Sequence, residues 1–207
     1  MLGIHHFWIF VAAGIVLNVT PGPDTFYILG RSISQGRAAG VLSALAISTG
    51  CVFHTTAAAL GLSAILKTSP LAFQVIRYLG AAYLVFLGIR LLFATSEDPQ
   101  AVAPKMASLW AIYRQGVLTN ILNPKVALFF LAFLPQFIDP AAPGHIAGLF
   151  VLGAVFMING TIYCVLLAWF AAAISDRLRA RSRLRGSLQR TTGALFIGLG
   201  AKLAVGA

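Results

Sequence analysis

Six long apolar runs dominate the sequence, and each is close to the length needed to cross a lipid bilayer. A hydrocarbon core about 30 Å thick takes about 20 helical residues at about 1.5 Å per residue. Charged or turn-forming residues bound the runs, which cover approximately residues 5–29, 41–66, 70–94, 112–138, 146–173 and 189–206. We therefore expect an all-α membrane protein with six transmembrane helices.

Composition supports a membrane protein over a soluble one. The chain is 59% hydrophobic and 10% charged, whereas a soluble domain is about 45–50% apolar and about 25% charged. With 207 residues and no long polar stretch, one transmembrane domain over residues 1–207 is expected. The net charge of +10 does not indicate nucleic-acid binding, because the basic residues lie in loops between apolar runs. Cysteine count and setting do not suggest a metal site, and we expect no metal and no cofactor.

Lysine and arginine alternate between the two sides of the expected membrane domain. Cytoplasmic loops carry the excess of these residues and face anionic lipids. Eleven lie in loops on one side: Arg31, Arg37, Arg90, Lys105, Arg114, Arg177, Arg179, Arg181, Arg183, Arg185 and Arg190. The other side carries Lys67, Arg77 and Lys202. We expect the first side to face the cytoplasm and both termini to lie outside.

The two halves of the chain, about 1–94 and 112–207, resemble each other. Short matches pair the first run with the fourth and the third with the sixth: Gly14 with Gly116, Asn18 with Asn120, and residues 87–91 with 199–203. Three helices per half reverse the direction of the second half, so we expect two inverted three-helix repeats, as in many secondary transporters. Chance similarity is the alternative.

Pro21, Gly22 and Pro23 interrupt the first run directly before Asp24, one turn after Asn18. Each proline lacks an amide donor, and its ring clashes with the carbonyl four residues earlier, here those of residues 17 and 19. Irregular backbone at membrane depth survives only where protein or a wet cavity satisfies it. The motif therefore indicates a broken helix beside a cavity, and a packing kink without ligand contact is the alternative.

Asn120, Asn123, Pro124 and Lys125 place a second break in the fourth run. Pro124 frees the carbonyl of Asn120 in the same way. A charge at the bilayer centre costs about 2.5–3.5 kcal/mol, so Asp24 and Lys125 need a partner or a function. Two explanations stay open: the two charges neutralise each other as a structural pair, or they bind a ligand.

The half-helices that begin after each break would direct positive N-terminal ends toward the bilayer midplane, where a carboxylate can bind. An amino acid suits such a site. Our hypothesis is that Lys125 and free amides bind the carboxylate, while Asp24 binds the ammonium or carries a coupling proton.

Three further polar residues lie near the middle of apolar runs. His54, in the second run, is a candidate for proton coupling because histidine titrates near neutral pH, and a hydrogen bond to a neighbouring helix is the blander explanation. Asn159 and Tyr163 lie one turn apart in the fifth run. Cavity lining and hydrogen bonding between helices explain this pair equally well.

Taken together, these motifs resemble the LysE/RhtB family of amino-acid exporters over essentially the whole chain. Residues 20–24, Thr-Pro-Gly-Pro-Asp, match the first-helix signature, and Asn-Pro-Lys at 123–125 with Val-Ala-Leu-Phe-Phe and Pro-Gln-Phe at 126–130 and 135–137 matches the fourth-helix one. The resemblance implies efflux of a small amino acid or derivative across the cytoplasmic (inner) membrane, driven by the proton gradient. It does not choose the substrate. A homodimer is compatible with the sequence but not required by it.

Two other classes of function are alternatives. An intramembrane enzyme would need a nucleophile with a base or a metal cluster, but the four histidines are scattered, and Gly-x-Ser-x-Gly and His-Glu-x-x-His motifs are absent from the sequence. We therefore do not expect an enzyme. A non-transporting membrane scaffold would leave the buried charges without a role.

Overall fold

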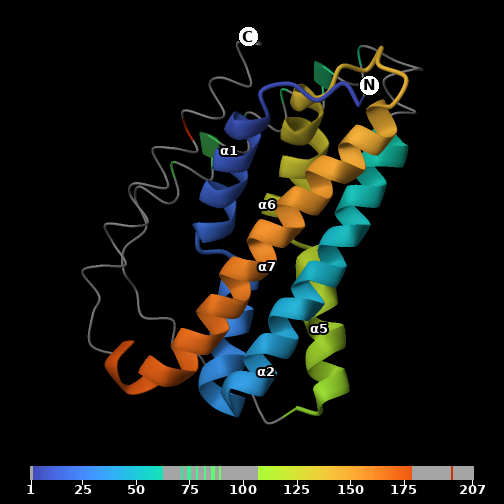
Figure 1. Ribbon diagram of the computed structural model, residues 1–207. Coiled ribbons are helices and arrows are strands. Elements are labelled where there is room, and N and C mark those ends of the chain that lie inside the picture. Colours follow the sequence, from blue (N-terminus) through green and yellow to red (C-terminus); the bar gives the residue numbers. More distant parts are fainter. Residues whose placement is uncertain are drawn as a thin grey trace.

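The computed structural model describes residues 2–62 and 107–178, together with scattered helical positions from 71 to 89 and at 197 (Figure 1). Every continuous element in this part of the chain is helical: α1 (Phe7–Val19), α2 (Pro23–Thr56), η1 (Ala57–Leu62), α5 (Leu109–Ile121), α6 (Pro124–Leu128), η2 (Phe129–Phe133), η3 (Leu134–Phe137) and α7 (His145–Leu178). The β-type pairing among the described residues is an isolated antiparallel bridge between Ile4 and Ile138.

Helix α2 reverses direction at Gly36. This residue has φ +84° and ψ −178°, a conformation that glycine adopts without the steric cost a side chain would add. A Cβ added at Gly40 would collide with the Ser32 hydroxyl, although residues eight apart in one straight helix are about 12 Å apart. Residues 23–35 and 37–56 are therefore two antiparallel arms.

Length and hydropathy identify up to three candidate membrane spans among the described residues. Pro23–Gly61, which the turn at Gly36 divides into two arms, and His145–Ala173 each qualify. Leu109–Ile121 with Pro124–Phe137 forms a third candidate, bent by 45° at its break. Phe7–Val19 is a shorter apolar helix, and it continues past a break into the first arm of α2. The chain is thus a multi-pass helical membrane protein.

The two broken segments run antiparallel to each other (Figure 1). At one end the His5 amide donates to the Phe137 carbonyl at 3.0 Å. At the other end the Tyr27 hydroxyl donates to the Ile112 carbonyl at 2.6 Å. The start of each segment therefore lies beside the end of the other, which brings the two breaks to the same level.

The second arm of α2 packs antiparallel along α7. A Cβ at Gly40 would lie 3.1 Å from Ala168 Cβ, and a Cβ at Gly153 would collide with Thr55. Between these points the Ser48 and Thr161 hydroxyls are hydrogen-bonded. Small residues at such contacts let the two backbones approach closely, which is how helices associate in lipid.

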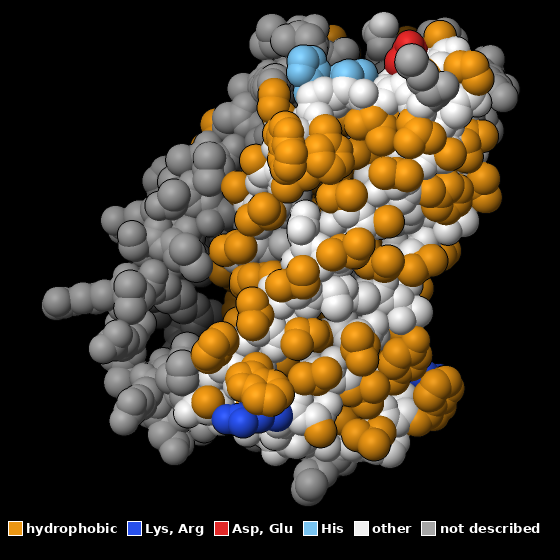
Figure 2. Space-filling view, viewed as in Figure 1, with side chains coloured by type: hydrophobic (Ala, Val, Ile, Leu, Met, Phe, Trp, Pro, Cys, Tyr) orange, Lys and Arg blue, Asp and Glu red, His pale blue; other side chains and the backbone are white. Residues whose placement is uncertain are grey.

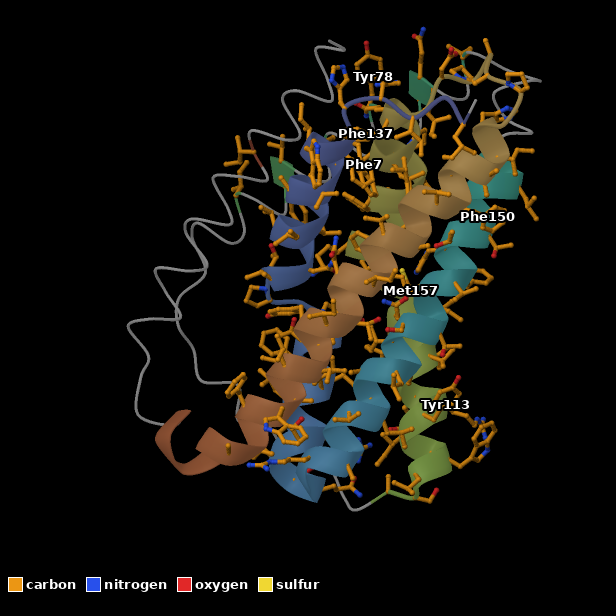
Figure 3. All side chains as sticks on the ribbon, viewed as in Figure 1. Phe7, Tyr78, Tyr113, Phe137, Phe150 and Met157 are labelled. Atoms are coloured by element: carbon orange, nitrogen blue, oxygen red, sulfur yellow. The ribbon has the colours of Figure 1, made fainter. Side chains whose placement is uncertain are left out.

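Phenylalanine rings fill the core between α1, η2, η3 and α7. The Phe129 centroid lies 5.1 Å from that of Phe133 and 4.8 Å from that of Phe156, and Phe10 lies 5.3 Å from Phe137. Each such aromatic pair contributes about 0.5–1.5 kcal/mol beyond area burial. Phe137 and the partly buried Phe7 lie at the end of this cluster near the chain's N-terminus (Figure 3).

Apolar side chains cover the middle of the visible surface, whereas charge gathers at its ends (Figure 2). Histidine and acidic side chains lie at the N-terminal end, and lysine and arginine lie at the opposite end. An apolar belt between two polar rims is the surface that a bilayer requires.

Four of the six expected runs coincide with described segments. Residues 112–138 and 146–173 correspond to 109–137 and 145–178. The expected loop at residues 30–40 is wrong, because helix continues on both sides of the turn at Gly36. Its polar residues are held in helix by side-chain bonds, such as that from Arg31 to Gln35 one turn later at 2.6 Å. The expected helices 70–94 and 189–206 lie largely outside the described residues, as do repeat matches 87–91 and 199–203.

Candidate functional site

The first break separates α1 from α2 at residues 20–22. Helix α1 ends at Val19, Thr20 turns back so that its amide and hydroxyl both donate to the Val16 carbonyl, and Gly22 is fully extended (φ −160°, ψ −172°). Pro23 then occupies the first helical turn of α2, where a missing amide costs least. Asp24 follows it, at the helix end that favours a negative charge.

The second break separates α5 from α6 at residues 122–123. Asn123 caps α6, and its side-chain oxygen accepts from the Lys125 amide at 3.1 Å. Pro124 occupies the first turn. Because this amide is already bonded, it is not one of the free amides expected to bind a substrate carboxylate.

Each break supplies a polar side chain to the other. The Lys125 ammonium donates to the Leu17 carbonyl at 3.1 Å and to the Thr20 carbonyl at 2.9 Å. The Asn120 side-chain amide donates to Asp24 Oδ2 at 2.9 Å. A lysine in the first turn of a helix lies at the positive end of the helix dipole, which is unfavourable. The hydrogen bonds to carbonyls at the end of α1 place the Lys125 ammonium beside the negative end of that helix.

The carbonyls that the prolines free are all met by side chains from other segments. Lys125 takes that of Leu17, His54 Nε2 lies 2.9 Å from that of Asn120, and the Tyr163 hydroxyl lies 3.5 Å from that of Val19. The His54 ring also stacks on Phe130 with a centroid distance of 6.0 Å. His54 and Tyr163 therefore make hydrogen bonds between helices in this structure.

Asp24 and Lys125 are both buried, yet no ion pair joins them in the part of the chain described here. Lys125 is directed at backbone carbonyls and Asp24 at Asn120. The two charges are close enough to interact through space, but direct contact between them is not the arrangement observed.

Four buried polar atoms at the two breaks lack a hydrogen-bond partner among the described residues: Asn18 Nδ2, Asp24 Oδ1, Asn120 Oδ1 and Asn123 Nδ2. Buried polar groups are hydrogen-bonded in the great majority of cases, so each exception requires an explanation. Two of these atoms are donors and two are acceptors. That combination matches a zwitterion, which presents an ammonium and a carboxylate.

A cavity lies against three of these residues, Asn18, Asp24 and Asn120. Its polar residues from the two broken segments are Asn18, Asp24, Thr25, Asn120 and Lys125. The rest of its wall comes mostly from α2 and α7: Leu17, Ile47, Ser48, Cys51, Val126, Phe156, Met157, Gly160, Thr161 and Cys164.

Several residues expected to bind substrate lie outside this lining. Pro21, Gly22, Pro23, Asn123 and Pro124 form the breaks themselves, and Asn159 and Tyr163 do not line the cavity. His54, the proton-coupling candidate, does not line it either. Gly22 has a specific role, because a Cβ there would lie 3.2 Å from Lys125 Nζ. The glycine thus leaves room for the lysine to cross between the breaks.

The sequence predicts that the second and fifth apolar runs line the site, which are the second arm of α2 and α7, but it did not identify most of the residues there that line the cavity. Ser48, Thr161 and Met157 are ordinary residues in apolar runs and carry no motif. Their spacing on one helix face was available as a signal, but it does not distinguish a cavity from a packed interface.

The family model described as LysE type translocator matches residues 15–207. The chain belongs to the LysE type translocator family. The leucine efflux protein of Salmonella choleraesuis (strain SC-B67) is 30% identical to this translocator over 203 residues, covering 98% of this chain and 96% of that protein. The uncharacterized membrane protein PA4757 of Pseudomonas aeruginosa is 33% identical over 210 residues, with coverage of 98% and 96%.

A third relative of the translocator is the uncharacterized membrane protein YrhP of Bacillus subtilis (strain 168), 32% identical over 209 residues and covering 96% of this chain and 98% of that protein. No solved structure matches the translocator significantly. Membership of the family places the translocator among membrane transport proteins rather than among intramembrane enzymes.

Proposed function

We propose that this translocator exports a small amino acid from the cytoplasm and binds it between the two helix breaks. The observation that carries the proposal is the set of three unpartnered buried polar atoms on residues that line the cavity, Asn18 Nδ2, Asp24 Oδ1 and Asn120 Oδ1. The relationship to a leucine efflux protein over nearly the whole chain supports amino-acid export.

Each end of the zwitterion has its own partners in this proposal. Asp24 Oδ1 and Asn120 Oδ1 accept from the substrate ammonium. Asn18 Nδ2 donates to the carboxylate, helped by Lys125, which uses two of its three N–H donors on backbone carbonyls. Asn123 contributes through its own amide or by holding the second break, while Asn159 and Tyr163 lie at the periphery.

The proposed architecture is two inverted three-helix repeats, about 1–94 and 112–207, in a single domain. The antiparallel course of the two broken segments supports it, because inverted repeats place equivalent helices in opposite directions. Rocking one repeat against the other would expose the site to each side in turn. The end rich in lysine and arginine faces the cytoplasm across the inner membrane, and both termini face outward.

Proton coupling is assigned to Asp24, with His54 as a second candidate. His54 lies against the Asn120 carbonyl, and the Asn120 side chain holds Asp24. A change of charge on either group therefore acts on the same short chain of hydrogen bonds. Such a chain can link proton binding to substrate release.

Counterflow of labelled leucine in proteoliposomes tests the proposal. We expect uptake stimulated by leucine loaded inside and enhanced by an imposed pH gradient, and a protonophore should abolish the enhancement. Asp24→Asn should reduce counterflow about tenfold or more, since hydrogen bonds to a charged group are worth about 1.5–3 kcal/mol. Asp139→Asn is the matched control, because Asp139 is exposed and its side chain accepts a hydrogen bond from the Ala141 amide in the same loop, away from the cavity.

Two outcomes would overturn the proposed function. Absence of counterflow for every amino acid tested would leave a non-transporting scaffold. Chemical conversion of the amino acid without flux would instead indicate an intramembrane enzyme.

A further inference from the structure

The cavity has two chemically different sides. The broken segments supply its charged groups, Asp24 and Lys125. The opposite side comes from the second arm of α2 and from α7, and it is lined mainly by carbon and sulfur: Ile47, Cys51, Phe156, Met157 and Cys164. A ligand that places its charges at the breaks would direct the rest of its atoms toward this second side.

Helical spacing explains why this side is continuous. Met157, Thr161 and Cys164 are separated by four and three residues on α7, and Ile47 and Cys51 by four on α2, so each set occupies one helix face. Met157 lies on α7 where this helix passes α2 (Figure 3). Its flexible thioether fills irregular apolar space and adapts to different neighbours.

The hydroxyls on this side are already bonded. Thr161 donates to the Met157 carbonyl, and Ser48 and Thr161 bond each other. Both hydroxyl donors are therefore used, so neither residue can donate a hydrogen bond to a substrate side chain.

No counter-charge is available here for an ionised side chain. Asp24 and Lys125 are the charged residues among the cavity-lining residues that the structure describes, and both are committed to the α-ammonium and α-carboxylate under the proposed function. A buried charge without a partner is costly. Lysine, arginine, aspartate and glutamate would each leave one.

We propose that α2 and α7 form a side-chain subsite, with Met157, Cys51 and Cys164 as its specificity-determining residues, that accepts uncharged aliphatic or thioether side chains. This inference rests on the proposed function, because it takes the breaks as the site for the zwitterion. The broken helices recognise what all amino acids share, and the unbroken helices select among them.

Competition in the counterflow assay tests the subsite. Unlabelled leucine and methionine should compete with labelled leucine, and lysine and glutamate should not. Met157→Ala should raise the preference for phenylalanine over leucine about tenfold, since a pocket's shape discriminates by about 10- to 200-fold per methylene. Ile158→Ala is the matched control, because that neighbour on α7 is 56% exposed on the outer surface.

A charge introduced at the same position gives a gain of function. Met157→Glu should make lysine a competitor, whereas Met157→Gln, which has the same shape without the charge, should not. If leucine counterflow in the wild type is robust and these three variants keep its substrate profile, the subsite is wrong while the proposed function stands. If the wild type transports no amino acid, the proposed function fails first.

A protection measurement on the wild type tests the subsite without relying on variants, which could fail to fold. Cys51 and Cys164 are the two cysteines of the chain, and both line the cavity. In the wild type, saturating leucine should slow their modification by methyl methanethiosulfonate, and lysine at the same concentration should not. Equal protection by lysine, or no protection by leucine in a protein that transports it, would overturn the subsite.

Discussion

The bond between Asn120 and Asp24 should make a measurable contribution to stability. Their side chains are 2% and 9% exposed, and the amide lies 2.9 Å from the carboxylate. Asn120→Leu keeps a similar volume and removes the donor. A hydrogen bond to a charged group contributes about 1.5–3 kcal/mol, and about 1 kcal/mol shifts the melting temperature of a protein of this size by about 2–4 °C. We expect Asn120→Leu to lower it by about 3–12 °C.

A double-mutant cycle separates this bond from general loss of packing. Asp24→Leu removes the acceptor, so Asn120→Leu should cost far less in that background, and the coupling energy should be about 1.5–3 kcal/mol. The assay is thermal denaturation of the purified protein in detergent, followed by the loss of the monodisperse peak in size-exclusion chromatography.

The matched control for the cycle is Asn159→Leu, a half-buried asparagine on α7 outside the cavity lining. Its effect should add to that of Asp24→Leu within about 0.5 kcal/mol. If the effects of Asn120→Leu and Asp24→Leu on stability also added within about 0.5 kcal/mol, the hydrogen bond between the two side chains would contribute nothing measurable. The inferred link between the two helix breaks would then be wrong.

Three further predictions follow from the same geometry. Lys125→Met leaves two buried carbonyls of the first break without their donor, and each unpaired group costs about 1–3 kcal/mol. Leucine counterflow should therefore be lost and the melting temperature should fall. Wild-type values of both would contradict the hydrogen bonds from Lys125 to the first break. Gly50→Ala would place a Cβ 2.7 Å from Asn120 Cβ, and such overpacking should destabilise the protein by about 1–3 kcal/mol in the same melting assay. Gly61→Ala should be close to neutral, because its added Cβ would meet no other segment of the described residues within 4 Å. Gly36→Ala strains a backbone with φ +84° and ψ −178° and should cost about 1–3 kcal/mol, measured as a lower melting temperature; an unchanged value would refute the tight turn.

The sequence predicted the breaks because proline acts on its own backbone. A ring without an amide frees a carbonyl four residues earlier whatever surrounds it, and Leu17 and Asn120 are indeed the carbonyls that Lys125 and His54 meet. The lengths of the apolar runs predicted a multi-pass helical membrane protein for a similar reason. Bilayer thickness and helical rise set those lengths independently of tertiary contacts.

The loop expected at residues 30–40 shows where local patterns failed. Polar residues there suggested loop, but Arg31 bonds Gln35 on its own helix and Gln115 on α5 at 2.7 Å. Tertiary partners therefore keep polar residues in helix up to a turn centred on a single glycine. A hydropathy pattern contains no information about such partners.

The sequence by itself determined that two apolar segments are interrupted, that they carry Asp24 and Lys125, and what kind of protein uses such segments. Covalent geometry and the bilayer act on each segment separately, so these features do not depend on tertiary contacts. Only the tertiary structure decided that Lys125 would bind carbonyls at the end of α1 instead of Asp24, and which residues of α2 and α7 would line the other side of the cavity. Those outcomes depend on how antiparallel helices register against one another, which is a property of the packed molecule as a whole.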